Sequence, residues 1–324
     1  MKLYKFIKGA IALWSILFAA NLTSAQELNE ILQNANLQAQ KYTEEFKNLL
    51  ADETKTFETY DKNGKLKKGS VIESNFFVLQ SEKSGNVTSE YRSVTKVDGK
   101  SVGDSEKRSA DLFEQIAKAK SPAEELERIQ KESSRYDKNI EISGFTLIQA
   151  PNLDESLRSF FEFNSLGIDH PSYSLEKIEG MNGRKIFVFE YRQTKASPNI
   201  SINQKKSNQS GLNINLEVDL PDSFKKSDVF LRGTLWIDAE TFQIWREERE
   251  VAAEKDKKLI VLQRTVFEYQ PSEYGILLPK QITFLQNKAK KVSGSFVETK
   301  IQSIVFQYSR WRKSNVDVQI LDDN

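Results

Sequence analysis

The sequence predicts an α+β fold: a curved antiparallel sheet of roughly eight to ten strands, a long N-terminal helix, and further helices packed on the sheet. Three observations indicate this fold. Apolar residues near the N-terminus recur at helical spacing, and alternating apolar and polar segments follow one another through the second half of the chain. The connections between those segments are short, whereas parallel strands need crossovers of a dozen or more residues.

The predicted N-terminal helix carries its apolar residues on one face. Their spacing alternates between four and three, as in an amphipathic helix. The residues are Leu28, Leu32, Ala35, Ala39, Tyr42, Phe46 and Leu49. The other face mixes both signs of charge, whereas helices that lie on membranes are usually rich in Lys and Arg. We therefore expect this helix to pack on the sheet.

The predicted strands are rich in β-branched and aromatic residues and are separated by turn residues. They are Ser70–Gln80, Val87–Val97, Tyr173–Glu179, Arg184–Arg192, Leu231–Ile237, Gln243–Ala252, Lys258–Tyr269, Lys280–Lys288 and Ser295–Tyr308. Ser105–Tyr136 predicts two helices broken near Pro122, and Gly144–Gly167 fits either strand or helix. The polar stretch Thr194–Leu212 predicts a mobile loop.

Residues 1–25 have the features of an export signal. Lys2, Lys5 and Lys8 precede an apolar run of about 12 residues, and Thr23-Ser24-Ala25 offers small residues for cleavage after Ala25. A run of that length is shorter than the roughly 20 residues that span a bilayer, although an uncleaved anchor is the alternative. We expect a periplasmic or secreted protein with a single domain over residues 26–324 and no transmembrane segment once the signal is removed.

Composition excludes several kinds of chemistry. The chain has one His and no Cys, which rules out thiol nucleophiles, disulfides and Cys-ligated or multi-His metal sites. A net charge of +1 without a basic stripe argues against nucleic-acid binding. We expect His170, beside Asp169, to be a loop residue and the charged run Trp245–Val251 to be the solvent face of a strand. The sequence thus predicts no catalytic residue, no metal and no cofactor.

Aromatic residues are the positive signal. Trp236, Phe267, Phe284 and Phe306 fall in predicted strands of the C-terminal half, so a curved sheet could bring several of them onto one face. Two interpretations stay open. The rings could form an ordinary core under the helices, or they could line an apolar groove for an acyl chain or a peptide.

The segment from Leu231 to Tyr308 resembles a known group of proteins. Arg232–Thr241 (RGTLWIDAET) is a strand entering a tight turn, and a charged strand, Phe267-Glu268-Tyr269 and Gly275–Pro279 follow. This order resembles the periplasmic lipoprotein carriers of the Lol system (LolA and LolB) and the outer-membrane lipoprotein-sorting-like proteins. The resemblance implies a half-barrel lidded by helices, whose apolar cavity shields the acyl chains of lipids or lipoproteins.

These observations predict a non-catalytic exported protein that binds or carries a lipid, acyl chain or other amphiphile in a half-barrel groove. The alternative is an envelope interaction module with a filled core and no small ligand, which would contact a partner protein through its surface or its long loop.

Overall fold

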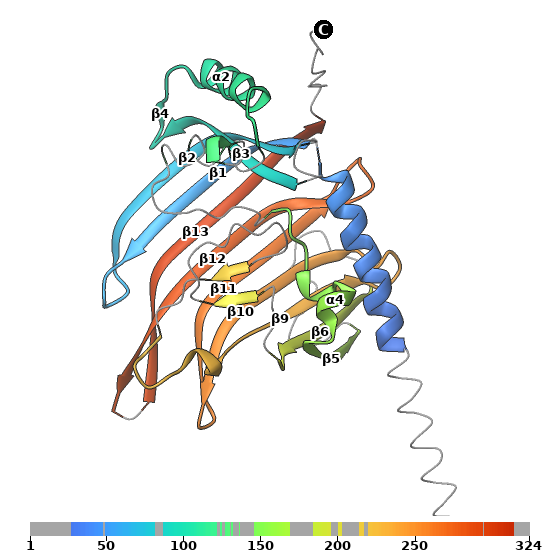
Figure 1. Cartoon of the computed structure of the whole chain (residues 1–324). Helices are drawn as coiled ribbons and strands as arrows, with labels where there is room; N and C mark the ends of the chain where they lie inside the picture. Colours follow the sequence, from blue (N-terminus) through green and yellow to red (C-terminus); the bar gives the residue numbers. More distant parts are fainter. Residues whose placement is uncertain are drawn as a thin grey trace, which may run out of the picture.

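The computed structural model describes residues 27–47, 49–81, 87–121, 146–168, 184–195, 200–202, 214–216, 220–293 and 295–313, together with 124, 127–129, 131 and 136. Its main feature is an eleven-stranded sheet with the order β4-β3-β2-β1-β13-β12-β11-β10-β9-β6-β5 (Figure 1). The strands are β1 (Leu49–Tyr60), β2 (Leu66–Ser81), β3 (Val87–Val97), β4 (Lys100–Ser101), β5 (Phe161–Ile168), β6 (Ile186–Gln193), β9 (Val229–Asp238), β10 (Ile244–Lys255), β11 (Lys258–Pro271), β12 (Leu277–Val292) and β13 (Ser295–Lys313).

Every neighbouring pair in this sheet is antiparallel, so the predicted α+β class and strand direction are confirmed. Among the described strands, β4 and β5 lie at the two ends of the order and do not pair with each other, so the sheet is open. Two further strands, β7 (Ile200–Ile202) and β8 (Ile214–Leu216), pair in parallel and stand apart from it.

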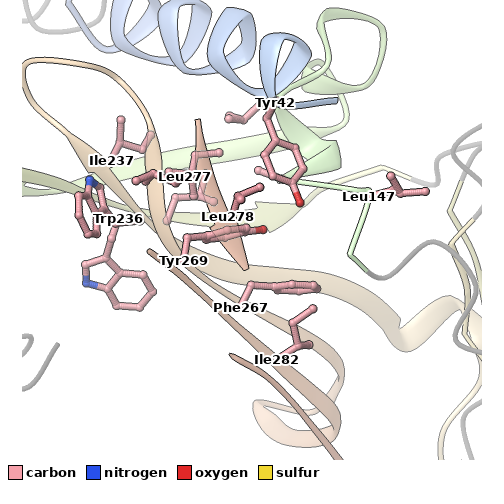
Figure 2. Packing of buried hydrophobic residues seen from close by; sticks show 14 of the residues in the cluster. Tyr42, Leu147, Trp236, Ile237, Phe267, Tyr269, Leu277, Leu278 and Ile282 are labelled. Carbon is pink, nitrogen blue, oxygen red and sulfur yellow. The ribbon is translucent and has the colours of Figure 1, made fainter. Parts of the chain in front are cut away.

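The N-terminal helix (residues 27–45) packs on one face of the sheet and ends where β1 begins. Its last apolar side chains make the contacts: Tyr42 meets Tyr269 of β11 edge to face at 6.0 Å between ring centroids, and Phe46 lies 6.4 Å from Phe76 of β2. Figure 2 shows Tyr42 pointing from the helix onto Tyr269, with Leu278 beside them. The predicted stripe is buried from Leu32 onward, but the helix is shorter than expected: Phe46 lies in the turn after it, and Leu49 begins β1.

A short segment, residues 146–150, crosses the same face; we call it the strap. Its backbone is hydrogen-bonded to Glu90 of β3 at one end and to Glu247 of β10 at the other. Those strands are six positions apart in the sheet, about 29 Å along its surface. The four-residue span between the two contacts reaches about 14 Å at most. Figure 1 shows that the sheet is curved, and we call the face that carries strap and helix the concave face.

The opposite, convex face carries α2 (Ser105–Ala117). Tyr91 and Phe77 of the β2–β3 pair point to this side, and both rings lie within 6.2 Å of the Phe113 ring. Leu112 completes a small buried cluster there. A one-turn 3-10 helix, η2 (Pro151–Leu153), and α4 (Glu155–Arg158) link the strap to β5, in the segment whose sequence fitted either strand or helix.

Most predicted strands are found with small shifts of their ends, but two expectations fail. The sequence predicted no strand between the helix and the turn at Asp61–Gly64, yet β1 occupies Leu49–Tyr60 at the centre of the sheet. The charged run Trp245–Val251 was expected to face solvent, whereas Glu247, Arg249 and Glu250 are buried.

Several expectations fall outside the described residues: the export signal at 1–25, His170, the strand Tyr173–Glu179 and most of the loop Thr194–Leu212. In the part of the chain that the structure describes, no helix is both long enough and apolar enough to cross a membrane.

Candidate functional site

Three of the four aromatic candidates lie together on the concave face. Ile282 of β12 pairs with both Phe267 and Phe306, and Phe284 pairs with Ile304 of β13. Directly paired residues of antiparallel strands point to the same side. Phe267, Phe284 and Phe306 therefore form an apolar floor across β11, β12 and β13, and each is 8 % exposed or less.

The fourth candidate, Trp236, lies on the other face. It pairs with Arg246 of β10, whereas its neighbour Leu235 pairs with Glu247 on the concave side. Its indole is buried, and the Arg246 guanidinium lies 5.0 Å from the ring centroid. Figure 2 sets Trp236 off to one side of Phe267 and Ile282. A ligand on the apolar floor would not contact Trp236 from the concave side.

Cations lie over two of the three floor rings. The Arg249 guanidinium is 4.7 Å from the centroid of Phe267, and Arg92 and the Lys55 ammonium each lie 5.5 Å from that of Phe306. Cation–π contacts of this kind are stronger when they are shielded from water. The floor is thus apolar in surface, and the arginines at its margins are paired with the buried carboxylates of Glu247, Glu53 and Glu90.

Glu247 anchors one side of this site. Its carboxylate accepts hydrogen bonds from Arg249 at 2.8 and 3.0 Å, from the Tyr191 hydroxyl at 3.0 Å and from the backbone N–H of Ala150 at 3.0 Å. Four donors match the acceptor sites of an ionised carboxylate. The fully buried Glu247 carboxylate therefore has a hydrogen-bond donor for each acceptor site, and it binds the strap to β10.

The hydrogen bond between Tyr191 and Glu247 explains why residue 233 is a glycine. Gly233 lies beside Tyr191 on the neighbouring strand, and a Cβ at this position would lie 2.5 Å from the Tyr191 hydroxyl oxygen and 2.0 Å from the Glu248 carbonyl oxygen. Any side chain there would displace the ring from Glu247. Gly233 thus leaves room for the Tyr191 ring beside it.

Glu90 anchors the other side in the same way. It accepts the backbone N–H groups of Thr146 and Leu147 at 2.7 and 3.1 Å and pairs with Arg92 at 3.0 Å. Arg92 also donates its Nε to both oxygens of Glu53, at 2.8 and 2.9 Å. Each end of the strap is therefore held by a buried carboxylate that is itself paired with an arginine two residues along its strand.

Lys55 lies beside this second network. Burial and, to a smaller extent, the charge of Arg92 lower its pKa from the usual 10.5 to about 7, against the opposing effect of Glu53. Nearby, burial raises the pKa of the Tyr308 hydroxyl well above its ordinary value. The charge of Lys55 thus changes near neutral pH.

Two polar groups on and beside the strap have no hydrogen-bond partner in the described structure: the Thr146 hydroxyl and the side-chain amide of Asn152. Both residues are buried, Asn152 completely. An unsatisfied buried polar group costs about 1–3 kcal/mol. Such groups next to an apolar floor are suited to accept or donate to the polar part of a ligand.

Sequence reasoning found the floor rings but missed the strap, the two carboxylate–arginine pairs and Asn152. A signal for Glu247 and Arg249 existed, since they lie two apart in a strand and so share a face. The sequence did not indicate which face that was, because their partners Tyr191 and Ala150 lie 56 and 97 residues away.

An open antiparallel half-barrel with a helix and a strap over its concave face is the class that this geometry defines. No protein-family model matches the chain, and no curated protein matches its sequence. Solved structures match most of its length at low sequence identity. Two of them bear names from the group that Leu231–Tyr308 resembles.

A putative outer membrane lipoprotein-sorting protein domain from Vibrio parahaemolyticus is 11% identical with a TM-score of 0.36, covering 88% of this chain and 92% of that one. A DUF1329 family protein from Desulfovibrio piger is 11% identical with a TM-score of 0.36, covering 87% and 92%. A LolA superfamily protein from Nitrosomonas europaea is 10% identical with a TM-score of 0.33, covering 87% and 96%. The fold is defined by the strand order of this chain itself.

Proposed function

We propose that the protein is a non-catalytic, exported carrier that holds an amphiphile, such as a lipid or an acyl chain, on its concave face. The apolar chain would lie on Phe267, Phe284 and Phe306, and the polar part would reach the Thr146 hydroxyl and the Asn152 amide. The observation that carries this proposal is the pair of unpartnered buried polar groups next to an apolar floor. The sequence of residues 1–25 supports export.

Ligand entry in this proposal requires the strap to move. The strap is tied down by hydrogen bonds to Glu90 and Glu247, together with one from Tyr42 to the Thr146 carbonyl. Individual hydrogen bonds contribute about 0.5–1.5 kcal/mol net each, so breaking a few of them is within the reach of ligand binding.

The second candidate function, an envelope interaction module with a filled core, is favoured by a different observation. The chain's own residues already bury the floor rings to 8 % exposure or less. Native mass spectrometry of protein purified from an envelope fraction separates the two functions. A retained lipid supports the carrier, whereas a ligand-free mass with a co-purified protein supports the interaction module.

Two variants test the carrier more closely. Phe284→Ser should lower lipid uptake, and Asn152→Leu should lower uptake without loss of stability, because the amide has no partner to lose among the described residues. Phe113→Ser is the matched control, since its ring packs on the convex face. Unchanged uptake in both Phe284→Ser and Asn152→Leu, with folded protein by circular dichroism, would remove the concave face as the binding site.

A further inference from the structure

Three hairpins end at the same side of the sheet. They connect β1 with β2, β12 with β13 and β10 with β11, and these six strands are consecutive in the sheet order. Figure 1 shows the three tips along one end, away from the contacts that the N-terminal helix makes. At about 4.8 Å between neighbouring strands, the row of tips is about 24 Å wide.

Each tip presents an aliphatic side chain to solvent. Leu66 is 59% exposed, Leu259 39% and Val292 52%, and Val297 of the same hairpin as Val292 is 49% exposed. These four belong to a set of six large hydrophobic residues that are exposed among the described residues. Exposed apolar side chains are therefore concentrated at this one end of the protein.

Lysines surround the aliphatic residues. Across residues 61–68, 255–259 and 288–297 there are ten lysines and two aspartates, a net charge of +8. The ten are Lys62, Lys65, Lys67, Lys68, Lys255, Lys257, Lys258, Lys288, Lys290 and Lys291. The whole chain has a net charge of +1, so the rest of it carries −7. The protein is thus electrically polarised toward the hairpin tips.

The backbone pairing of the middle hairpin with its neighbours ends before its tip. Pairing of β12 with β11 stops at Gln286, and pairing of β13 with β1 stops at Gln302. Beyond these points β12 and β13 continue to pair with each other as far as Val292 and Ser295. Lys290, Lys291 and Val292 therefore stand at the end of a two-stranded ribbon.

We propose that these three tips dock on an anionic lipid surface, with the lysines against the headgroups and the aliphatic side chains inserted between them. The aliphatic residues are distributed one or two to a hairpin, and single side chains can each partition into a fluid bilayer interface. A protein partner would instead be matched by a contiguous apolar patch. Lysines near an anionic leaflet add binding strength that salt screens. This inference stands on the tips alone and is independent of a ligand on the concave face.

The experiment measures binding of the exported, processed protein to vesicles by co-sedimentation. One set is phosphatidylcholine alone, and the other is equal parts phosphatidylcholine and phosphatidylglycerol. The test variants are Lys290→Gln/Lys291→Gln, which removes two charges, and Val292→Ser, which removes one aliphatic side chain. The control variant is Lys107→Gln/Lys120→Gln, which removes two exposed lysines outside the tips. All variants are first compared with the parent by thermal melting.

We expect the parent to bind the phosphatidylglycerol vesicles and to be released by salt. Loss of two headgroup-facing lysines lowers the partition coefficient about 25-fold, since each contributes about a five-fold effect. Val292→Ser lowers it about ten-fold, and the control changes it less than two-fold. The proposal is overturned if the parent fails to bind these vesicles, or if the control double variant loses as much as the tip double variant. Equal binding by Val292→Ser and parent also overturns it, because the aliphatic side chain would then contribute nothing to binding.

Discussion

Lys55→Met should change how the stability of the protein depends on pH. Lys55 is 2% exposed, and burial is the main reason why its pKa falls from 10.5 to about 7. In the unfolded chain a lysine titrates near 10.4. Between these two values the unfolded state binds more protons than the folded state, so the free energy of unfolding rises with pH. Below about pH 7 the lysine is charged in both states, and its full destabilising effect is present.

The size of the effect follows from the two titration curves. One pKa unit corresponds to about 1.4 kcal/mol, and the part of the difference that is recovered between about pH 7 and pH 9 is about 2 kcal/mol. Lys55→Met lacks this titration, so its free energy of unfolding should rise about 2 kcal/mol less than that of the parent over this interval.

Urea unfolding at three pH values between neutral and about pH 9 measures this difference. Lys107→Met, at an exposed position of α2, is the matched control and should run parallel to the parent. If the free energies of unfolding of the parent and of Lys55→Met also change in parallel with pH, burial does not make Lys55 lose its proton near neutral pH. The reasoning then fails.

Three further changes test the packing of the sheet. Glu247→Gln should destabilise by about 3–5 kcal/mol in urea unfolding, because the Arg249 charge stays buried without its counter-ion; a loss under about 1 kcal/mol would mean that water reaches the pair. Gly233→Ala should lower the melting temperature sharply, since its Cβ has no room, whereas Gly103→Ala, with nothing within 4 Å, should leave the melting temperature unchanged. Trp236→Ala should cost about 3–5 kcal/mol of stability and leave lipid uptake per folded molecule unaltered; reduced uptake would contradict its position on the convex face.

The sequence predicts much of the fold because periodicity and turn chemistry are local signals. The N-terminal helix, β3 and the run β9 to β13 follow from spacing and turn residues alone. β1 was missed because its concave-face row contains charged residues: Leu49 and Ala51 are followed by Glu53 and Lys55. A strand whose buried row contains charges does not have the alternating pattern that marks a half-buried strand.

The site could be predicted in part for the same reason. Several of four aromatic rings were expected to share a face, and register brings Phe267, Phe284 and Phe306 together. Trp236 lies one position away from the concave-face row of β9, and a shift of one residue moves a side chain to the other face. The strap contacts depend on pairs as far apart as Glu247 and Ala150, and no local pattern carries that information.

The openness of the sheet leaves two edges that could template pairing with another chain, and each edge is blunted. β4 is only two residues long, and beyond it the β3 carbonyls of Val94 and Thr95 are occupied by Arg108 and the Val102 N–H. β5 is broken by a register shift between Ser165 and Gly167. Short or irregular edge strands discourage edge-to-edge aggregation. A half-barrel whose two edge strands do not pair with each other is thereby protected against growing into longer sheets or fibrils.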